Sequence, residues 1–138
     1  MIEDEIREIL DEISTRKRRY YAEMLRQLDL HIGQDQLLCR LWKEEGITQN
    51  QLSERLNCEP STVANMVKAL ENYDLIYRQR DELDARVNRV YLTAKGQDLK
   101  EPIEKLWKKQ QGKLLDGLSS DELLILKKLL KKMAENIS

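Results

Sequence analysis

Apolar residues recur every three or four positions along residues 2–28, apart from one step of seven where Lys17 occupies the missing turn, and this spacing predicts one long amphipathic helix. No glycine or proline interrupts the segment. A short joint follows at residues 30–33, and a second apolar stripe predicts a helix over about residues 34–45. Gly46 stands where a glycine commonly ends a helix.

Two short helices are predicted next from their start signals. Thr48 and Gln51 have the spacing of a capping box, which opens a helix that runs to about Leu56. Pro60 suits the first position of the following helix, because its missing N–H is not needed there. That helix, residues 60–73, is expected to bury four apolar side chains: Val63, Met66, Val67 and Leu70.

The period then changes to one typical of strands. Residues 75–80 and 87–92 are rich in β-forming residues and partly alternate, and a charged stretch at 81–86 separates them. This pattern predicts a β-hairpin with a polar tip.

Two further helical segments complete the pattern. Thr93 caps a predicted helix over about residues 94–115, which Pro102 should kink or interrupt. A second capping box, at residues 119–122, opens a last helix with a broad apolar face and four lysines on its other side. The predicted fold class is therefore mainly α with one small β-hairpin.

Composition narrows the class of protein. With 138 residues, the chain has the size of one domain, and its 24 basic and 25 acidic residues leave a net charge of −1. No apolar run approaches the roughly 20 residues that span a bilayer, and the acidic start does not resemble a secretory signal, so a cytoplasmic protein without a membrane segment is expected.

The residues that enzymes and metal sites need are scarce. The chain has one histidine, and its two cysteines lie 19 positions apart, so a zinc site is not expected. There is no nucleotide-binding glycine loop and no nucleophile motif. We therefore expect neither an enzyme nor a cofactor.

The order of the predicted elements is that of a winged helix-turn-helix. The helix at 60–73 would expose short hydrogen-bonding side chains and one cation near its N-terminus, which suits a DNA major groove about 12 Å wide. These candidate contacts are Ser61, Thr62, Asn65 and Lys68. At the hairpin tip, Arg86 could enter a minor groove, with Asp84 holding the guanidinium in position.

At these residues the sequence resembles the MarR family of transcriptional regulators. The matching runs are 46–52, Pro60–Val63 with Leu70 and Glu71, 84–86, and 90–96. The resemblance implies a winged helix-turn-helix region at 31–93, flanked by dimerisation helices at 1–30 and 94–138. It carries the recognition-helix role to Ser61, Thr62, Asn65 and Lys68, and the wing-tip role to Asp84 and Arg86.

The resemblance also implies partners. A homodimer would place two recognition helices in successive major grooves of a pseudo-palindromic double-stranded DNA site, most often as a repressor. Small phenolic or lipophilic effectors are common in this family, and five side chains could line such a pocket or simply pack: Tyr20, Tyr21, Met24, Trp42 and Trp107. Asn65 and Ala85 depart from the family, since many members have a basic residue at each position.

Two alternatives stay open at this stage. The winged helix could dock on a protein instead of on DNA.

The second alternative concerns the cysteines. Cys58 precedes the recognition helix, where oxidation could disturb DNA binding, whereas Cys39 is expected to pack inside. The peroxide-sensing members carry their reactive cysteine toward the N-terminus, where this chain has none.

Overall fold

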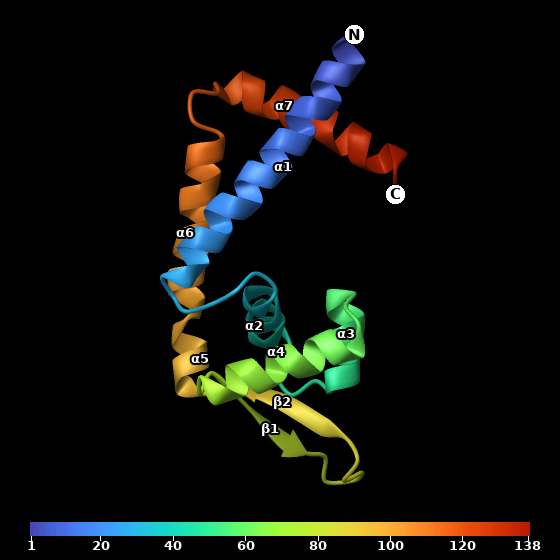
Figure 1. The fold of residues 1–138 in the computed structure, drawn as a ribbon, viewed down its shortest axis with the longest axis vertical. Coiled ribbons are helices and arrows are strands. Elements are labelled where there is room, and N and C mark those ends of the chain that lie inside the picture. The colour runs from blue at the N-terminus through green and yellow to red at the C-terminus, as the bar shows by residue number, and fades with distance from the viewer.

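The computed structural model describes all 138 residues and contains seven helices and one two-stranded antiparallel sheet (Figure 1). In chain order the elements are α1 (Ile2–Arg26), α2 (Gln34–Lys43), α3 (Gln49–Leu56), α4 (Pro60–Asn72), β1 (Ile76–Arg80), β2 (Asn88–Leu92), α5 (Ala94–Asp98), α6 (Lys100–Leu114) and α7 (Ser120–Asn136). The predicted order of elements is confirmed, and most boundaries agree within two residues.

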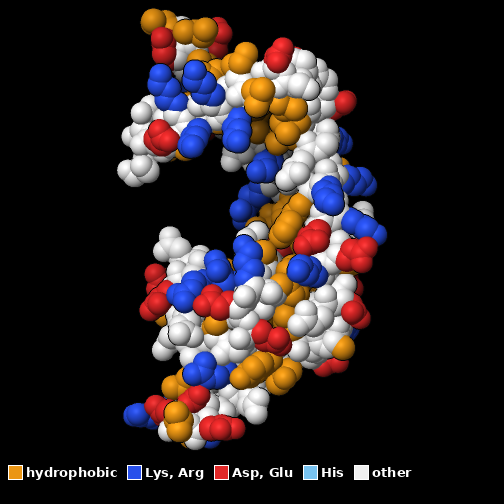
Figure 2. All heavy atoms as spheres, turned by 180° about the vertical axis from the view of Figure 1, so that it is seen from behind, with side chains coloured by type: hydrophobic (Ala, Val, Ile, Leu, Met, Phe, Trp, Pro, Cys, Tyr) orange, Lys and Arg blue, Asp and Glu red, His pale blue; other side chains and the backbone are white.

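The molecule is elongated, with its two ends built differently (Figure 1). α1 and α6 pack against each other along the long axis. At one end α2, α3, α4 and the β-hairpin form a winged-helix part, a name that refers below to residues 31–93. At the other end α7 leaves α6 through a tight turn at Gly117, whose φ is +85°. Figure 2 shows a concave side between these ends.

One core of 15 buried apolar residues lies in the winged-helix part and the helices next to it. α1 contributes only Leu25 to this core, and α6 contributes only Ile103. The remaining members are Leu30, Leu37, Leu38, Leu41, Ile47, Leu52, Val63, Val67, Leu70, Leu75, Ile76, Val90 and Leu92. The end that carries α7 has no comparable core.

The hairpin is extended by the segment before α3. β1 and β2 pair in register from Ile76 opposite Leu92 to Arg80 opposite Asn88. The Gly46 N–H donates to the Val90 carbonyl at 2.9 Å, and the Val90 N–H donates to Ile47 at 3.0 Å. Residues 46–48 therefore form a short third edge beside β2 and tie the hairpin to α3.

The helix starts follow the predicted caps. Thr48 and Gln51 form the reciprocal capping bonds of α3, at 3.1 and 2.9 Å, and Ser119 and Glu122 do the same for α7. Pro60 is the first residue of α4. The predicted helix at 94–115 is divided at Leu99 into α5 and α6, as expected from Pro102, whose ring would clash with the carbonyl four residues earlier.

Two expectations need correction. Met66 is only half-buried: it packs against the margin of the core, and its sulfur lies close to Gly33, so it is not one of the fully buried residues of α4. The second helix ends at Lys43, two residues early, since the chain turns at Glu44 to bring Gly46 against β2. No helix is both long and apolar enough to cross a membrane.

Candidate nucleic-acid interface

α4 presents one polar face and one buried face. Val63, Val67 and Leu70 are fully buried, and they fix the roll of the helix against the core. The four predicted contact residues all lie on the exposed face: Ser61, Thr62, Asn65 and Lys68. Three of the four lie in the first half of α4, near the helix N-terminus, whose unpaired N–H groups and positive dipole favour an anion.

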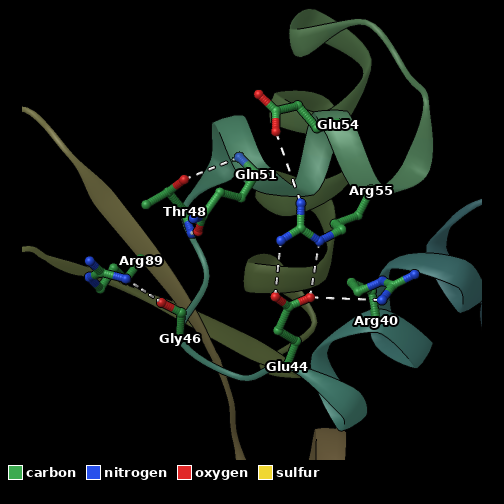
Figure 3. A network of polar contacts seen from close by, with 8 residues as sticks. All are labelled: Arg40, Glu44, Gly46, Thr48, Gln51, Glu54, Arg55 and Arg89. Carbon is green, nitrogen blue, oxygen red and sulfur yellow. Dashed lines mark hydrogen bonds and ion pairs between the residues drawn. The ribbon is translucent and has the colours of Figure 1, made fainter.

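A bidentate ion pair joins α3 to the C-terminal end of α2 (Figure 3). Arg55 donates from Nε and Nη2 to the two carboxylate oxygens of Glu44, each at 3.2 Å. Arg40 approaches the same carboxylate at 3.7 Å. The pair joins residues 11 apart in the sequence, and it holds the helix that supports α4.

The hairpin tip holds Arg86 as predicted. Its Nε and Nη2 donate to the Asp84 carboxylate at 3.1 and 3.2 Å, and its own N–H donates to Asp84 Oδ1 at 3.0 Å. The hydrogen bond from Arg86 is the main reason that the pKa of Asp84 lies below its ordinary value. The Arg86 side chain is still 90% exposed. Asp84 therefore orients the guanidinium without covering it, and a binding partner can reach it.

A second ion pair, which the sequence did not indicate, secures the base of the tip. Arg89 Nε donates to Asp81 at 2.7 Å. Its Nη1 donates to the Gly46 carbonyl at 2.9 Å, a bond that Figure 3 shows. The other Asp81 oxygen accepts the N–H groups of Leu83 and Asp84, both at 3.1 Å. The bond from Arg89 is the main cause that lowers the pKa of Asp81.

The hairpin and the helices are thus joined into one unit. Arg78 on β1 forms a bidentate pair with Glu71 on α4, at 2.9 and 3.2 Å. A cleft of about 290 Å³ separates the hairpin tip from the start of α3, lined by Thr48, Gln49, Asn50, Arg86, Val87 and Asn88. An aspartate followed by a polar turn is a local signal for the Asp81 bonds, whereas no sequence pattern pairs Arg89 with Gly46.

The five side chains predicted as candidates for an effector pocket do not lie together in the structure. Tyr21 and Trp107 line a pocket of about 500 Å³ between α1, α2 and α6. Tyr20 lies on another face of α1, under the Lys113 ammonium at 4.5 Å. Met24 is buried, and Trp42 packs against the core and donates to the Gly96 carbonyl at 3.2 Å.

Neither cysteine forms a disulfide, and both are half-buried. The Cys58 thiol donates to the Leu56 carbonyl at 3.4 Å and packs against the core. No group of three or more potential metal ligands occurs in the structure.

Comparisons with known proteins agree on one family. The sequence model of the MarR family matches residues 30–87. The HTH-type transcriptional regulator MgrA of Staphylococcus aureus is 29% identical over 116 residues, which are 83% of this chain and 78% of MgrA. The solved structure of the transcriptional regulator SlyA is 30% identical, with a TM-score of 0.77 over 97% of this chain and 94% of that one.

A protein–DNA complex is among the similar structures. The S. aureus MepR–DNA complex is 29% identical to this chain, with a TM-score of 0.78 over 93% of this chain and 95% of MepR. These likenesses cover the helices at both ends as well as the winged-helix part.

Proposed function

Because the chain belongs to the MarR family of transcriptional regulators, we propose that it is a homodimeric repressor that binds a pseudo-palindromic DNA site. In this proposal residues 31–93 bind DNA, and residues 1–30 and 94–138 form the dimer. The observation that carries it is the exposed polar face of α4 beside a wing arginine that is already held in place.

α4 would read the major groove. Ser61 and Thr62 suit phosphates or base edges, Asn65 suits an adenine, and Lys68 supplies a cation. The buried stripe on the opposite side of α4 lets these four side chains enter the groove without disturbing the core.

The wing would contact the minor groove. Arg86 is exposed, and its guanidinium is attracted by the negative potential of a narrow minor groove. Asp84 would fix its direction before binding, so that less side-chain entropy is lost when the complex forms.

The dimer explains an otherwise uncovered apolar surface. All 17 residues of α7 remain outside the core, and the exposed side chains include Leu124, Leu129 and Leu130. The first half of α1 likewise exposes isoleucines, among them Ile6 and Ile9. Figure 2 shows exposed apolar side chains near α7, and a second copy of the chain would bury both surfaces.

An effector would act at the junction of the two parts. The pocket beside Tyr21 and Trp107 combines aromatic rings with amides and the cations Lys17 and Arg18. A small phenolic or lipophilic molecule there could release the DNA only if it binds the two dimer shapes unequally.

The first experiment selects bound sequences from a random double-stranded DNA pool at a stated salt concentration. We expect an inverted repeat with half-sites about one helical turn apart, which the two α4 helices of a dimer would require. The matched control is a variant with Asn65→Ala and Lys68→Ala, which should recover a weaker or altered motif from the same pool.

A protein-docking function is the second candidate, and one observation favours it. The hairpin region at residues 75–92 carries four arginines against three acidic residues, and three of the arginines form ion pairs: Arg78, Arg86 and Arg89. Such a surface attracts phosphates weakly. If no motif is enriched and binding to DNA does not fall with salt, the DNA-binding proposal is wrong and the docking function remains.

A further inference from the structure

Three side chains from three helices form a continuous hydrogen-bond network at the junction between the long helices and the winged-helix part. Trp107 of α6 donates from Nε1 to the Tyr21 hydroxyl of α1 at 2.6 Å. That hydroxyl donates in turn to Asp35 Oδ2 of α2 at 2.7 Å. Neither bond could be read from sequence spacing, since Tyr21 and Trp107 lie 86 positions apart.

Asp35 is fully buried at the second position of α2. Its Oδ1 accepts the Gly33 N–H at 3.0 Å, and its Oδ2 accepts a second, longer bond from Gln36 at 3.3 Å. The N-terminus of α2 stabilises the negative charge. The carboxylate is therefore held rigidly to the first turn of α2, and any group bonded to it takes its orientation from that helix.

The bond between Tyr21 and Asp35 joins the long helices directly to the winged-helix part. It is the only side-chain hydrogen bond that joins α1 or α6 to the winged-helix part. The other direct contacts of these two helices with the core are mainly apolar, through residues such as Leu25 and Ile103. α5, which leads into α6, is held separately to α2 by the bond from Trp42 to the Gly96 carbonyl at 3.2 Å. Apolar burial is not directional, so it holds the parts together without fixing the angle between them.

The hydroxyl keeps its proton under all ordinary conditions. Burial, followed by the hydrogen bond to Asp35, raises the pKa of Tyr21 well above its usual range. Tyr21 is thus a permanent donor to the carboxylate, and hydrogen bonds to charged groups are among the stronger ones in proteins.

We propose that Tyr21 is a positioning residue for DNA binding: its hydroxyl, held by Trp107 and bonded to Asp35, sets the angle of the winged-helix part on the long helices. In a dimer built through α1 and α7 this angle determines the separation of the two α4 helices. The consequence for DNA rests on the proposed function, whereas the orientation itself does not.

The test variant is Tyr21→Phe, which removes one oxygen atom and keeps the ring. Its matched control is Tyr20→Phe at the neighbouring position of α1, where the ring packs under Lys113 and the hydroxyl forms no hydrogen bond within the chain. Asp35→Asn is the second variant, since it keeps an oxygen acceptor but removes the charge.

The first measurement needs no DNA. Spin labels are placed on cysteines introduced at Asn72 of α4 and Lys109 of α6, both exposed, in a background with Cys39→Ala and Cys58→Ala. Labelled chain is diluted with unlabelled chain, and the distance distribution within one chain is recorded. We expect a broader distribution for Tyr21→Phe, an intermediate one for Asp35→Asn, and no change for Tyr20→Phe. Equal widths for Tyr21→Phe and Tyr20→Phe would overturn the proposal.

The second measurement uses the site obtained by selection and the same site with one base pair inserted between its halves. We expect Tyr21→Phe to weaken binding to the selected site about three- to tenfold, up to about 1.4 kcal/mol. The penalty for the insertion should shrink, and the salt dependence should stay unchanged because no phosphate contact is lost. An undiminished insertion penalty would overturn the step from orientation to DNA. A broadened distribution in a protein that selects no DNA would support the positioning role and contradict the proposed function.

Discussion

At the scale of single residues, Arg86 offers the most direct test of the wing. Changing Arg86 to Ala should weaken DNA binding by about 1 to 2 kcal/mol, roughly five- to thirtyfold in Kd, because a minor-groove cation is lost. The side chain is 90% exposed and bonds only to Asp84, so the melting temperature should hardly change. Affinity is measured by fluorescence anisotropy on the selected site.

The control for charge alone is Lys128→Ala on the exposed side of α7, at the opposite end of the molecule (Figure 1). It removes the same unit of charge and should leave the affinity nearly unchanged. Equal Kd values for the Arg86 variant and the unmodified protein would exclude a minor-groove contact by this residue.

Asp81 gives a pH-dependent prediction. Its pKa in the folded protein is depressed below the ordinary 3.8, chiefly by the hydrogen bond from Arg89. A depressed pKa means that the carboxylate stabilises the fold at pH values above 3.8 and loses this effect as the pH falls through the folded-state pKa. Asp81→Asn should therefore lower the melting temperature at neutral pH, and the difference should vanish in acid.

Thermal unfolding followed by circular dichroism from neutral pH down to about pH 2 covers this window. Asp98→Asn serves as the control, because Asp98 is exposed and forms no ion pair. A melting difference for Asp81→Asn that is as large in acid as at neutral pH would show that the Asp81 charge does not stabilise the wing.

Residue contacts were predictable from the sequence only where they are local. Asp84 and Arg86 lie two positions apart, and their expected contact is present. The bond from Arg89 to Gly46 spans 43 positions and depends on how residues 46–48 meet β2, which no periodicity encodes. The DNA roles of Ser61, Thr62, Asn65, Lys68, Asp84 and Arg86 stay predictions, since they depend on a partner outside the chain.

At the scale of elements, the packing of α5 on the hairpin yields the sharpest prediction. A Cβ added to Gly96 would meet the Leu75 carbonyl oxygen at 2.1 Å, and that atom is backbone that cannot rotate away. Gly96→Ala should therefore displace α5 from Leu75, just before β1, and destabilise the fold by about 2 kcal/mol or more. Chemical denaturation measures the loss.

Gly112 in α6 is the matched control. Nothing lies within 4 Å of a Cβ added there, so Gly112→Ala should stabilise the helix by up to about 1 kcal/mol. The two identical substitutions are thus expected to have opposite signs. A Gly96→Ala variant as stable as the Gly112→Ala variant would contradict the close contact between α5 and Leu75.

Elements were more predictable than contacts because their signals are local. The caps at Thr48, Thr93 and Ser119 all form as the sequence indicates, and the break before Pro102 occurs where its ring excludes a helical carbonyl. The periodicity did not predict that Met66 is only half-buried, since the same spacing fits a residue at the centre of a buried face and one at its edge.

At the scale of the whole molecule, the sequence predicted the fold class but not the angle between its two parts. The apolar stripes of α1 and α7 indicated that both helices must be covered, and a single chain leaves both exposed. What fixes the angle is a hydroxyl, a carboxylate and an indole brought together from Tyr21, Asp35 and Trp107. Their separation along the chain is too large for any pattern of spacing to reveal.

The final prediction concerns α7 as a dimer element. None of its residues is buried in the single chain, and a lone helix of 17 residues is only marginally stable in water, so its apolar face needs a partner. Leu130 lies on that face with 43% of its surface exposed. Leu130→Gln should weaken the dimer by at least about 2 kcal/mol, roughly thirtyfold in the dimer Kd, because each chain loses one buried leucine.

Sedimentation velocity over a dilution series measures this change, with Lys131→Gln on the neighbouring exposed position as the control. The control should dissociate like the unmodified protein, since it leaves the apolar face intact. Because DNA binding by two α4 helices requires the dimer, the Leu130→Gln variant should also lose affinity for the full inverted repeat while binding a single half-site as before. A variant that stays dimeric at nanomolar concentration would exclude this face of α7 from the interface, and the surface that joins the two copies would then lie elsewhere on the long helices.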